Sequence, residues 1–184
     1  MLKIKKDNWK KYRFDEIAQN ISERVEPVNT DLDVYVGLEH LDSESIHIVR
    51  HGHPSDVKGT KLKVYKGDVI FGKRRAYQRK AAVADFDGIC SAHSMVVRAN
   101  KDVISPELLP FFLHSDAFMH RAIDISEGSL SPTIKWNVLA RQKYLIPPID
   151  QQNSLRDLLF YSDNYLQKLY SLLSNIKVSI DVLY

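Results

Sequence analysis

"KLKVYKGDVIFGKRRAYQRKAAVADFDGICSAHSMVVRAN", residues 61–100, contains the most β-rich part of the chain. Three runs of β-branched and other apolar residues predict strands at residues 62–65, 69–71 and 95–97. The pairs Lys66-Gly67 and Asp87-Gly88 predict turns that interrupt them. We therefore predict a β core whose loops carry the polar groups.

The strand at residues 69–71 runs directly into a basic loop. Residues 57–80 hold nine Lys/Arg and one acid, a formal charge of +8, whereas residues 144–184 carry −1. A solvated charged surface is the simpler interpretation, and a polyanion-binding face is the alternative. Cationic side chains can pair with phosphates, and Arg and Gln can form hydrogen bonds with the edges of guanine and adenine, respectively. The candidate contacts in this loop are Lys73, Arg74, Arg75, Tyr77, Gln78, Arg79 and Lys80. Tyr77 either stacks on a sugar or closes the core.

Composition limits the class of protein. With 184 residues, 44% of them hydrophobic and 27% charged, the chain can bury one core and carry an appended element. Its single cysteine, Cys90, allows no disulfide within the chain and no cysteine-based zinc site, which favours a reducing cytoplasm. No stretch of about eighteen apolar residues is present, so no signal peptide or membrane span is expected.

Upstream of the β core, two segments have readable patterns. Apolar residues at near-helical spacing predict a short amphipathic helix within residues 8–25. Residues 33–49 then predict two short strands, or one strand followed by an irregular turn. Downstream of the core, residues 105–123 predict a helix with Ser105 as its N-cap, kinked or split at Pro110.

A second polar loop follows at residues 126–135, "SEGSLSPTIK". Short hydroxyl side chains beside a lysine suit contacts with a nucleic-acid backbone, although a plain surface turn would have the same composition. The candidate residues are Ser129, Ser131, Thr133 and Lys135. A final strand is then stopped by Pro147-Pro148, which predicts a boundary between a domain at 1–148 and a separate segment at 149–184.

The last segment has a heptad pattern. From Leu155, positions that alternate by four and three residues are apolar in eight of nine cases, with Ser162 as the exception. This predicts a coiled-coil helix of roughly 45 Å that pairs with a second helix. The alternative is a helix that lies on its own domain. The predicted pairing residues are Leu155, Leu159, Leu166, Leu169, Leu173, Ile176, Ile180 and Leu183. The expected fold class is an α+β domain followed by a long helix.

Three stretches in this order resemble one half of the specificity (S) subunit of type I restriction-modification enzymes. The first is the "GDVIFGKRR" strand leading into Lys80-Ala81 and then "DGICS" at residues 87–91. The second is the loop at residues 126–134, and the third is "PPIDQQ", residues 147–152, at the entry to the heptad helix. The resemblance covers nearly the whole chain.

The resemblance implies a DNA-reading subunit with no catalytic residues and no metal or cofactor of its own. Its partners would be double-stranded DNA, methyltransferase (M) subunits that use S-adenosylmethionine, and a restriction (R) subunit. Family members normally carry two recognition domains and two helices, so one of each implies a half-subunit that forms a homodimer or pairs with another S half. A coiled-coil nucleic-acid adaptor without a restriction-modification role is the alternative, and an unrecognised hydrolase is a third, weaker one.

Other chemistries have less support in the sequence. His51-Gly52-His53 resembles half a metal site, but no further ligands follow at fixed spacing. Cys90 is expected to be a buried thiol. "IPPI", residues 146–149, lacks the polar and aromatic residues with which adenine methyltransferases hold a flipped base. The chain has no Gly-rich loop ending in G-K-[ST] and no carboxylate-x-lysine cluster around Asp68.

Overall fold

An antiparallel sheet in the order β2-β9-β6-β7 forms the centre of the computed structural model, which describes residues 6–183, with side chains through residue 179. A second sheet, β3-β5-β8-β4, adjoins it, and β1 pairs with β10. The strands are β1 (Lys10–Arg13), β2 (Ala18–Ile21), β3 (Arg24–Val25), β4 (Tyr35–Val36), β5 (Lys61–Val64), β6 (Val69–Phe71), β7 (Ala81–Val83), β8 (Gly88–Cys90), β9 (Met95–Ala99) and β10 (Lys143–Ile146).

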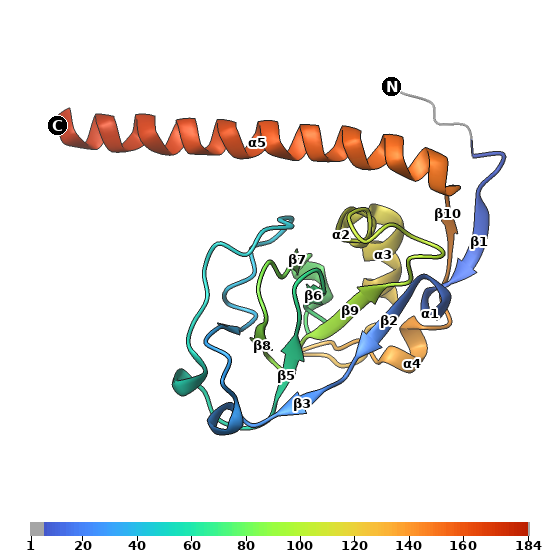
Figure 1. Cartoon of the computed structure of the whole chain (residues 1–184), viewed down its shortest axis with the longest axis horizontal. Coiled ribbons are helices and arrows are strands. Elements are labelled where there is room, and N and C mark those ends of the chain that lie inside the picture. Colours follow the sequence, from blue (N-terminus) through green and yellow to red (C-terminus); the bar gives the residue numbers. More distant parts are fainter. Residues whose placement is uncertain (1–5, 184) are drawn as a thin grey trace.

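Short helices pack against one face of the central sheet, and the last helix leaves the domain (Figure 1). They are α1 (Phe14–Ile17), α2 (Leu109–His114), α3 (Asp116–Asp124), α4 (Trp136–Leu139) and α5 (Ile149–Leu183), with 3-10 turns at Pro27–Asn29, Pro54–Asp56 and Ala76–Gln78. The predicted α+β class with a long C-terminal helix is confirmed.

Strand β6 matches the predicted strand at residues 69–71 and is buried on both faces. Because side chains alternate along a strand, Val69 and Phe71 pack in one apolar cluster and Ile70 in the other. Its neighbours are β9, with Ile70 opposite Val96, and β7. The strand thus joins the two cores and holds the beginning of the basic loop in a defined place.

The turn before β6 explains the Gly-Asp pair of the sequence. Gly67 has a φ of +92°, a conformation that costs glycine little. Asp68 is buried, accepts a hydrogen bond from the Tyr65 amide (3.0 Å), and receives two more from Arg98 on β9 (2.7 and 2.9 Å). The carboxylate therefore links the turn to the neighbouring strand.

The helix predicted within residues 8–25 is wrong except for one turn. Phe14 and Ile17 are fully buried in the four-residue helix α1, but β1 precedes it and β2 follows it. The flanking residues find partners far away in the sequence, since β1 pairs with β10 and β2 with β9. These sheet hydrogen bonds outweigh the local preference for a helix.

The helix predicted from residue 105 to 123 is split, but at a different residue. Ser105 Oγ accepts a hydrogen bond from the Leu108 amide (3.3 Å), in the manner of a cap. The break comes at Ser115, which ends α2 and caps α3 by accepting from the Phe118 amide (3.3 Å). Pro110 lies in the first turn of α2, where its missing amide hydrogen costs no hydrogen bond.

Residues 33–49 contain strand β4 followed by irregular backbone, which confirms the second of the two predicted possibilities. Strand β4 runs parallel to β8, and Cys90 on β8 is fully buried, as expected. Burial raises the pKa of the Cys90 thiol to about 12. The thiol is therefore protonated at neutral pH and unreactive.

Helix α5 begins at Ile149, directly after Pro147-Pro148 and six residues before the first predicted heptad position. Its 35 residues span roughly 50 Å at 1.5 Å per residue. Leu155 and Leu159 pack against the domain core, and Asp163 Oδ2 lies 2.7 Å from His47 Nε2. Beyond this contact the helix extends past the domain (Figure 1). The first half of the helix therefore lies on the domain, as in the alternative, and the second half projects. Its pairing with a second helix stays a prediction.

Candidate nucleic-acid interface

The two predicted loops lie against each other although about fifty residues separate them in the sequence. The Arg75 amide donates to the Pro132 carbonyl (2.7 Å), and the Ile134 amide donates to the Lys73 carbonyl (3.0 Å). A bridge pairs Arg74 with Thr133. The basic loop that follows β6 and the hydroxyl-rich loop therefore form one continuous surface.

Three side chains of the basic loop are available on this surface. Arg75 is exposed, and its Nη2 lies 3.3 Å from Ser131 Oγ of the other loop. Arg74 Nη1 lies 3.4 Å from His93 Nε2. Tyr77 is 53% exposed, so it does not close the core. These groups are placed to meet a partner.

The backbone of this loop is unusual. Arg75 and Arg79 both have left-handed conformations, with φ of 57° and 50°, on either side of the 3-10 turn Ala76–Gln78. Such conformations are uncommon for residues other than glycine and are enriched at functional sites. Gln78 is half-buried at the end of this turn, and its carbonyl accepts from Ser43 Oγ (2.7 Å).

Two of the predicted contacts are engaged inside the chain. Arg79 Nη2 donates to the His114 carbonyl (2.8 Å) and lies 3.1 Å from Asp116 Oδ1. Lys80 Nζ donates to the Leu38 carbonyl (2.7 Å). Both cations hold the loop against the rest of the domain. This corrects the expectation that all five cations of the loop face outward.

The second loop presents mixed groups. Ser129 is exposed, whereas Ser131 and Thr133 are half-buried beside the first loop. Lys135 Nζ pairs with Glu127 Oε2 at 2.6 Å, so its charge is partly compensated. Both side chains of this pair are well exposed, and such surface pairs are weak.

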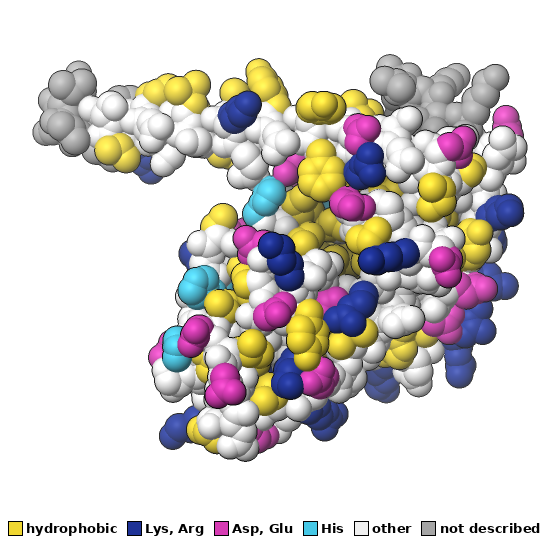
Figure 2. Space-filling model, in the orientation of Figure 1, with side chains coloured by type: hydrophobic (Ala, Val, Ile, Leu, Met, Phe, Trp, Pro, Cys, Tyr) yellow, Lys and Arg dark blue, Asp and Glu magenta, His cyan; other side chains and the backbone are white. Residues whose placement is uncertain are grey.

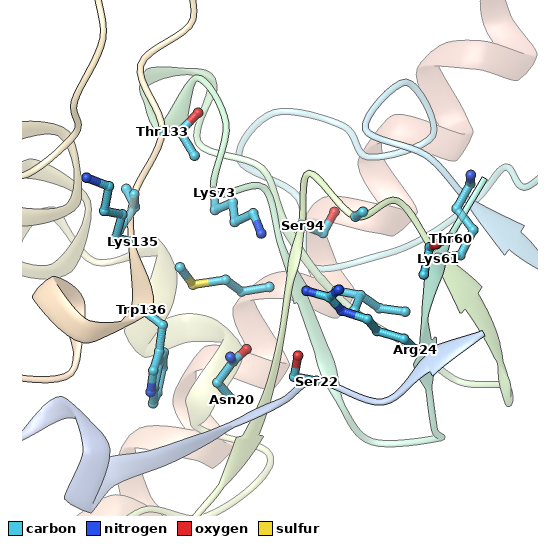
Figure 3. A pocket seen from close by; sticks show the side chains of 14 residues that line it. Asn20, Ser22, Arg24, Thr60, Lys61, Lys73, Ser94, Thr133, Lys135 and Trp136 are labelled. Carbon is cyan, nitrogen blue, oxygen red and sulfur yellow. The ribbon is translucent and has the colours of Figure 1, made fainter. Parts of the chain in front are cut away.

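A cleft of about 470 Å³ lies beside the joined loops. It is bounded by the ends of β2, β3, β5 and β9 and by the segment from Thr133 to Trp136 (Figure 3). Four of its lining residues are Lys or Arg and none is Asp or Glu. Its polar lining residues include Asn20, Ser22, Arg24, Thr60, Lys61, Lys73, Ser94, Thr133 and Lys135, with Trp136 beside them.

Three of these lining residues, Lys73, Thr133 and Lys135, are among the DNA contacts predicted from the sequence. Asn20, Ser22 and Arg24 were missed because they fall in the segment predicted as a helix. Ser94 was missed because a single serine between two strands carries no pattern. One of the missed lining residues, Lys61, could have been found from the sequence, because it belongs to the basic run at residues 57–80.

Like charges crowd this part of the surface. Partial burial lowers the pKa of Lys73, and the charge of Arg24 acts in the same direction. Partial burial, followed by the charges of Arg74 and Lys73, lowers the pKa of His93. The imidazole is therefore neutral at pH 7 and can accept a hydrogen bond from Arg74. A bound anion would stabilise every cation of this group.

Helix α5 carries a second exposed feature. Its heptad positions beyond the domain are uncovered, and Figure 2 shows apolar side chains along the projecting helix. The exposed members are Leu166, Leu169, Leu173 and Ile176. Leu155 and Leu159 are partly covered by the domain itself. The side chains of Ile180 and Leu183 lie outside the described residues.

The remaining candidates have structural roles. His53 Nδ1 accepts from the Ser55 amide (3.3 Å) and so caps the 3-10 turn Pro54–Asp56. Within residues 6–183, no three His, Cys, Asp or Glu side chains gather as a metal site would require. The same described part of the chain contains no helix with the length and apolarity to cross a membrane.

The described chain is thus an α+β domain with two joined polar loops and a long helix that leaves it. The chain is 23% identical over 180 residues to the specificity subunit of type I restriction enzyme EcoDI from Escherichia coli, covering 92% of this chain and 39% of that protein. It is also 23% identical to the HindI specificity subunit from Haemophilus influenzae, covering 87% and 36%. The chain thus spans less than half the length of these curated relatives. No family model matches.

Solved structures show the same fold. The HsdS subunit from Thermoanaerobacter tengcongensis superposes with a TM-score of 0.72 at 23% identity, over 96% of this chain and 47% of that one. A chain from a study of complex assembly in a type I R-M system gives 0.71 at 24% identity, over 90% and 44%. The type I S subunit from M. genitalium gives 0.63 at 15%, over 93% and 43%. The resemblance to one half of a type I specificity subunit is confirmed in sequence and in fold.

Proposed function

We propose that the chain is a DNA-recognition half of a type I specificity subunit. Residues 1–148 would read one half-site, and residues 149–184 would pair with a second helix. The observation that carries the proposal is the joining of the two polar loops, through Arg75 and Pro132, beside a cleft with four cations and no acid in its lining. The whole surface suits a polyanion, and the named relatives are specificity subunits.

The loop residues divide into two roles. Lys73, Arg74 and Lys135 suit contacts with phosphates, together with the hydroxyls of Ser129, Ser131 and Thr133. Arg75 can contact a phosphate or a guanine edge in the major groove, Gln78 has the side chain that reads an adenine edge, and Tyr77 can stack on a sugar. Arg79 and Lys80 hold the loop in shape.

The long helix supplies the second half of the proposal. Leu166, Leu169 and Leu173 continue the helix face on which Leu155 and Leu159 pack against the domain core, and they lie where the helix extends past the domain (Figure 1). A second helix can therefore pack on the stripe without meeting the domain. The partner would be a second copy or another S half.

The chemistry would belong to other subunits. M subunits with S-adenosylmethionine would methylate the DNA, an R subunit would cleave it, and this chain would hold them at the target in the cytoplasm. The alternative is a coiled-coil nucleic-acid adaptor without that role. The two differ in whether a methyltransferase partner acquires sequence specificity from this chain.

The Arg74→Ala, Arg75→Ala double variant is expected to weaken DNA binding and to lower the slope of log K against log salt by about 2, because two phosphate-facing cations are lost. Fluorescence anisotropy with a labelled duplex at several salt concentrations measures the slope. Lys58→Ala, Lys66→Ala is the matched control, since it removes two exposed cations of the same basic run outside the joined loops. Equal slopes for the two double variants would contradict the proposed face.

Co-expression with a type I methyltransferase subunit tests the function directly. The purified complex is expected to methylate adenine at one defined sequence, and the subunit without this chain is expected not to. Sequencing that detects methylated bases on random-sequence DNA reads the target. Co-purification without sequence-defined methylation would favour the adaptor.

A further inference from the structure

Three strand ends meet at one part of the basic cleft. In the register of the central sheet, Phe71 at the end of β6 lies opposite Met95 at the start of β9, and Ile21 at the end of β2 lies opposite Val96. The residues just beyond these ends are therefore neighbours. They are Lys73 after β6, Ser94 before β9, and Ser22 and Arg24 after β2, and all four line the cleft.

Ser94 is the unusual member of this group. It is 1% exposed, and its hydroxyl has no hydrogen-bond partner among the residues that the structure describes. A buried hydroxyl without a partner destabilises the folded protein, and such groups are rare in native structures. The other buried serine, Ser91, accepts from the His93 amide (3.2 Å). Ser94 lines the cleft, so a ligand bound in the cleft can supply the hydrogen-bond partner that the hydroxyl lacks.

The cations beside Ser94 also lack partners. Lys73 is half-buried, and within the described part of the chain neither its Nζ nor the Arg24 guanidinium forms a hydrogen bond or an ion pair. Lys135 differs, because Glu127 compensates it. Figure 3 shows Lys73, Arg24 and Ser94 around the same space. This part of the cleft thus combines two uncompensated cations with an unused hydroxyl donor.

We propose that Lys73, Arg24 and Ser94 form a binding site for a single phosphate group, which on the proposed function is a backbone phosphate of the recognised DNA. Lysine and arginine would supply charge, and Ser94, which turns about one side-chain torsion, would donate its hydroxyl hydrogen to a phosphate oxygen. One phosphate held in the cleft would set the register in which the joined loops meet the bases.

Ser94→Ala separates this role from a structural one. Because the hydroxyl has no partner in the free protein, its removal is expected to leave the melting temperature unchanged or to raise it. DNA affinity is nevertheless expected to fall about tenfold or more, since a hydrogen bond to a charged group is lost. The salt slope should stay the same because a neutral donor releases no counterion.

Lys73→Met tests the charge. Its duplex affinity should fall about tenfold and its salt slope by about 1, whereas Lys66→Met, which removes an exposed lysine outside the cleft, should remain within about twofold of the wild type. The measurement is anisotropy of a labelled duplex with the full chain. Unchanged affinity for both Ser94→Ala and Lys73→Met, with a wild type that binds DNA, would overturn the phosphate site alone. A wild type that binds no DNA, alone or with M subunits, would overturn the proposed function.

Inorganic phosphate distinguishes the possible sources. At matched ionic strength it is expected to raise the melting temperature of the wild type but not of Lys73→Met, and to compete with the duplex. If phosphate raises the melting temperature but does not compete with the duplex, the cleft binds a free phosphate compound. That result would overturn the assignment of the site to a DNA phosphate.

Discussion

A chain that carries Leu169→Asp is expected to sediment as a monomer at concentrations at which the wild type is paired through α5. Leu169 is 37% exposed and lies in the apolar stripe between Leu166 and Leu173. Pairing would bury the new carboxylate against leucines. The cost is about 3 kcal/mol or more, which weakens association by roughly 100-fold.

Ser171→Asp is the matched control for the pairing experiment. Ser171 is exposed only two residues away, but on a helix this places it on the side opposite the stripe. The control should sediment like the wild type. Light scattering that finds a wild-type monomer in the micromolar range would contradict the homodimer, and the same pair of variants would then be compared for binding to a separate S half.

Gln152→Leu is expected to lower the free energy of unfolding by about 3 kcal/mol, because three main-chain groups in buried or partly buried surroundings lose their hydrogen bonds together. Gln152 is 1% exposed, and its Oε1 accepts from the Ser105 amide (2.8 Å). Its Nε2 donates to the carbonyls of Val103 (2.8 Å) and Pro147 (2.9 Å). The side chain therefore ties the start of α5 to the segment at residues 103–105 and to Pro147, which directly precedes the helix. Leucine fills a similar volume and keeps water from replacing these bonds.

The neighbouring glutamine is the control for this measurement. Gln151 makes one side-chain hydrogen bond, from Trp9 Nε1 (3.0 Å), at a partly exposed position. Gln151→Leu is expected to cost about 1 kcal/mol or less. Urea unfolding of both variants gives the comparison through the midpoint and the slope. Similar losses for the two variants would show that the junction does not depend on Gln152.

Some elements were predictable because local patterns and burial agree. Both faces of the strand at residues 69–71 pack in a core, so its residues are all apolar instead of alternating between apolar and polar. The continuous apolar run was therefore sufficient to predict the strand. Pro147-Pro148 stops the last strand because proline lacks the amide that a sheet requires. Helix α5 followed from its heptads, whose apolar positions recur at a helical period.

Other elements were not predictable because their partners are distant in the sequence. The apolar residues around Phe14 have helical spacing. The segment is nevertheless mostly strand, because it pairs with residues 96–99 and 143–146 in the sheets. Arg79 belongs to the same basic run as Arg75, and its contacts with His114, Asp116 and Glu44, which are distant in the sequence, turn it inward.

The sequence by itself determined the α+β class, the end of the last strand before Pro147-Pro148, the long helix and the two polar loops as candidates. These depend on residue type and on spacing within a few turns of the chain. Only the tertiary structure decided that the loops join at Arg75 and Pro132, and that Ser94 comes to lie beside Lys73 without a partner. The reason is that strand register brings together residues that no local pattern connects.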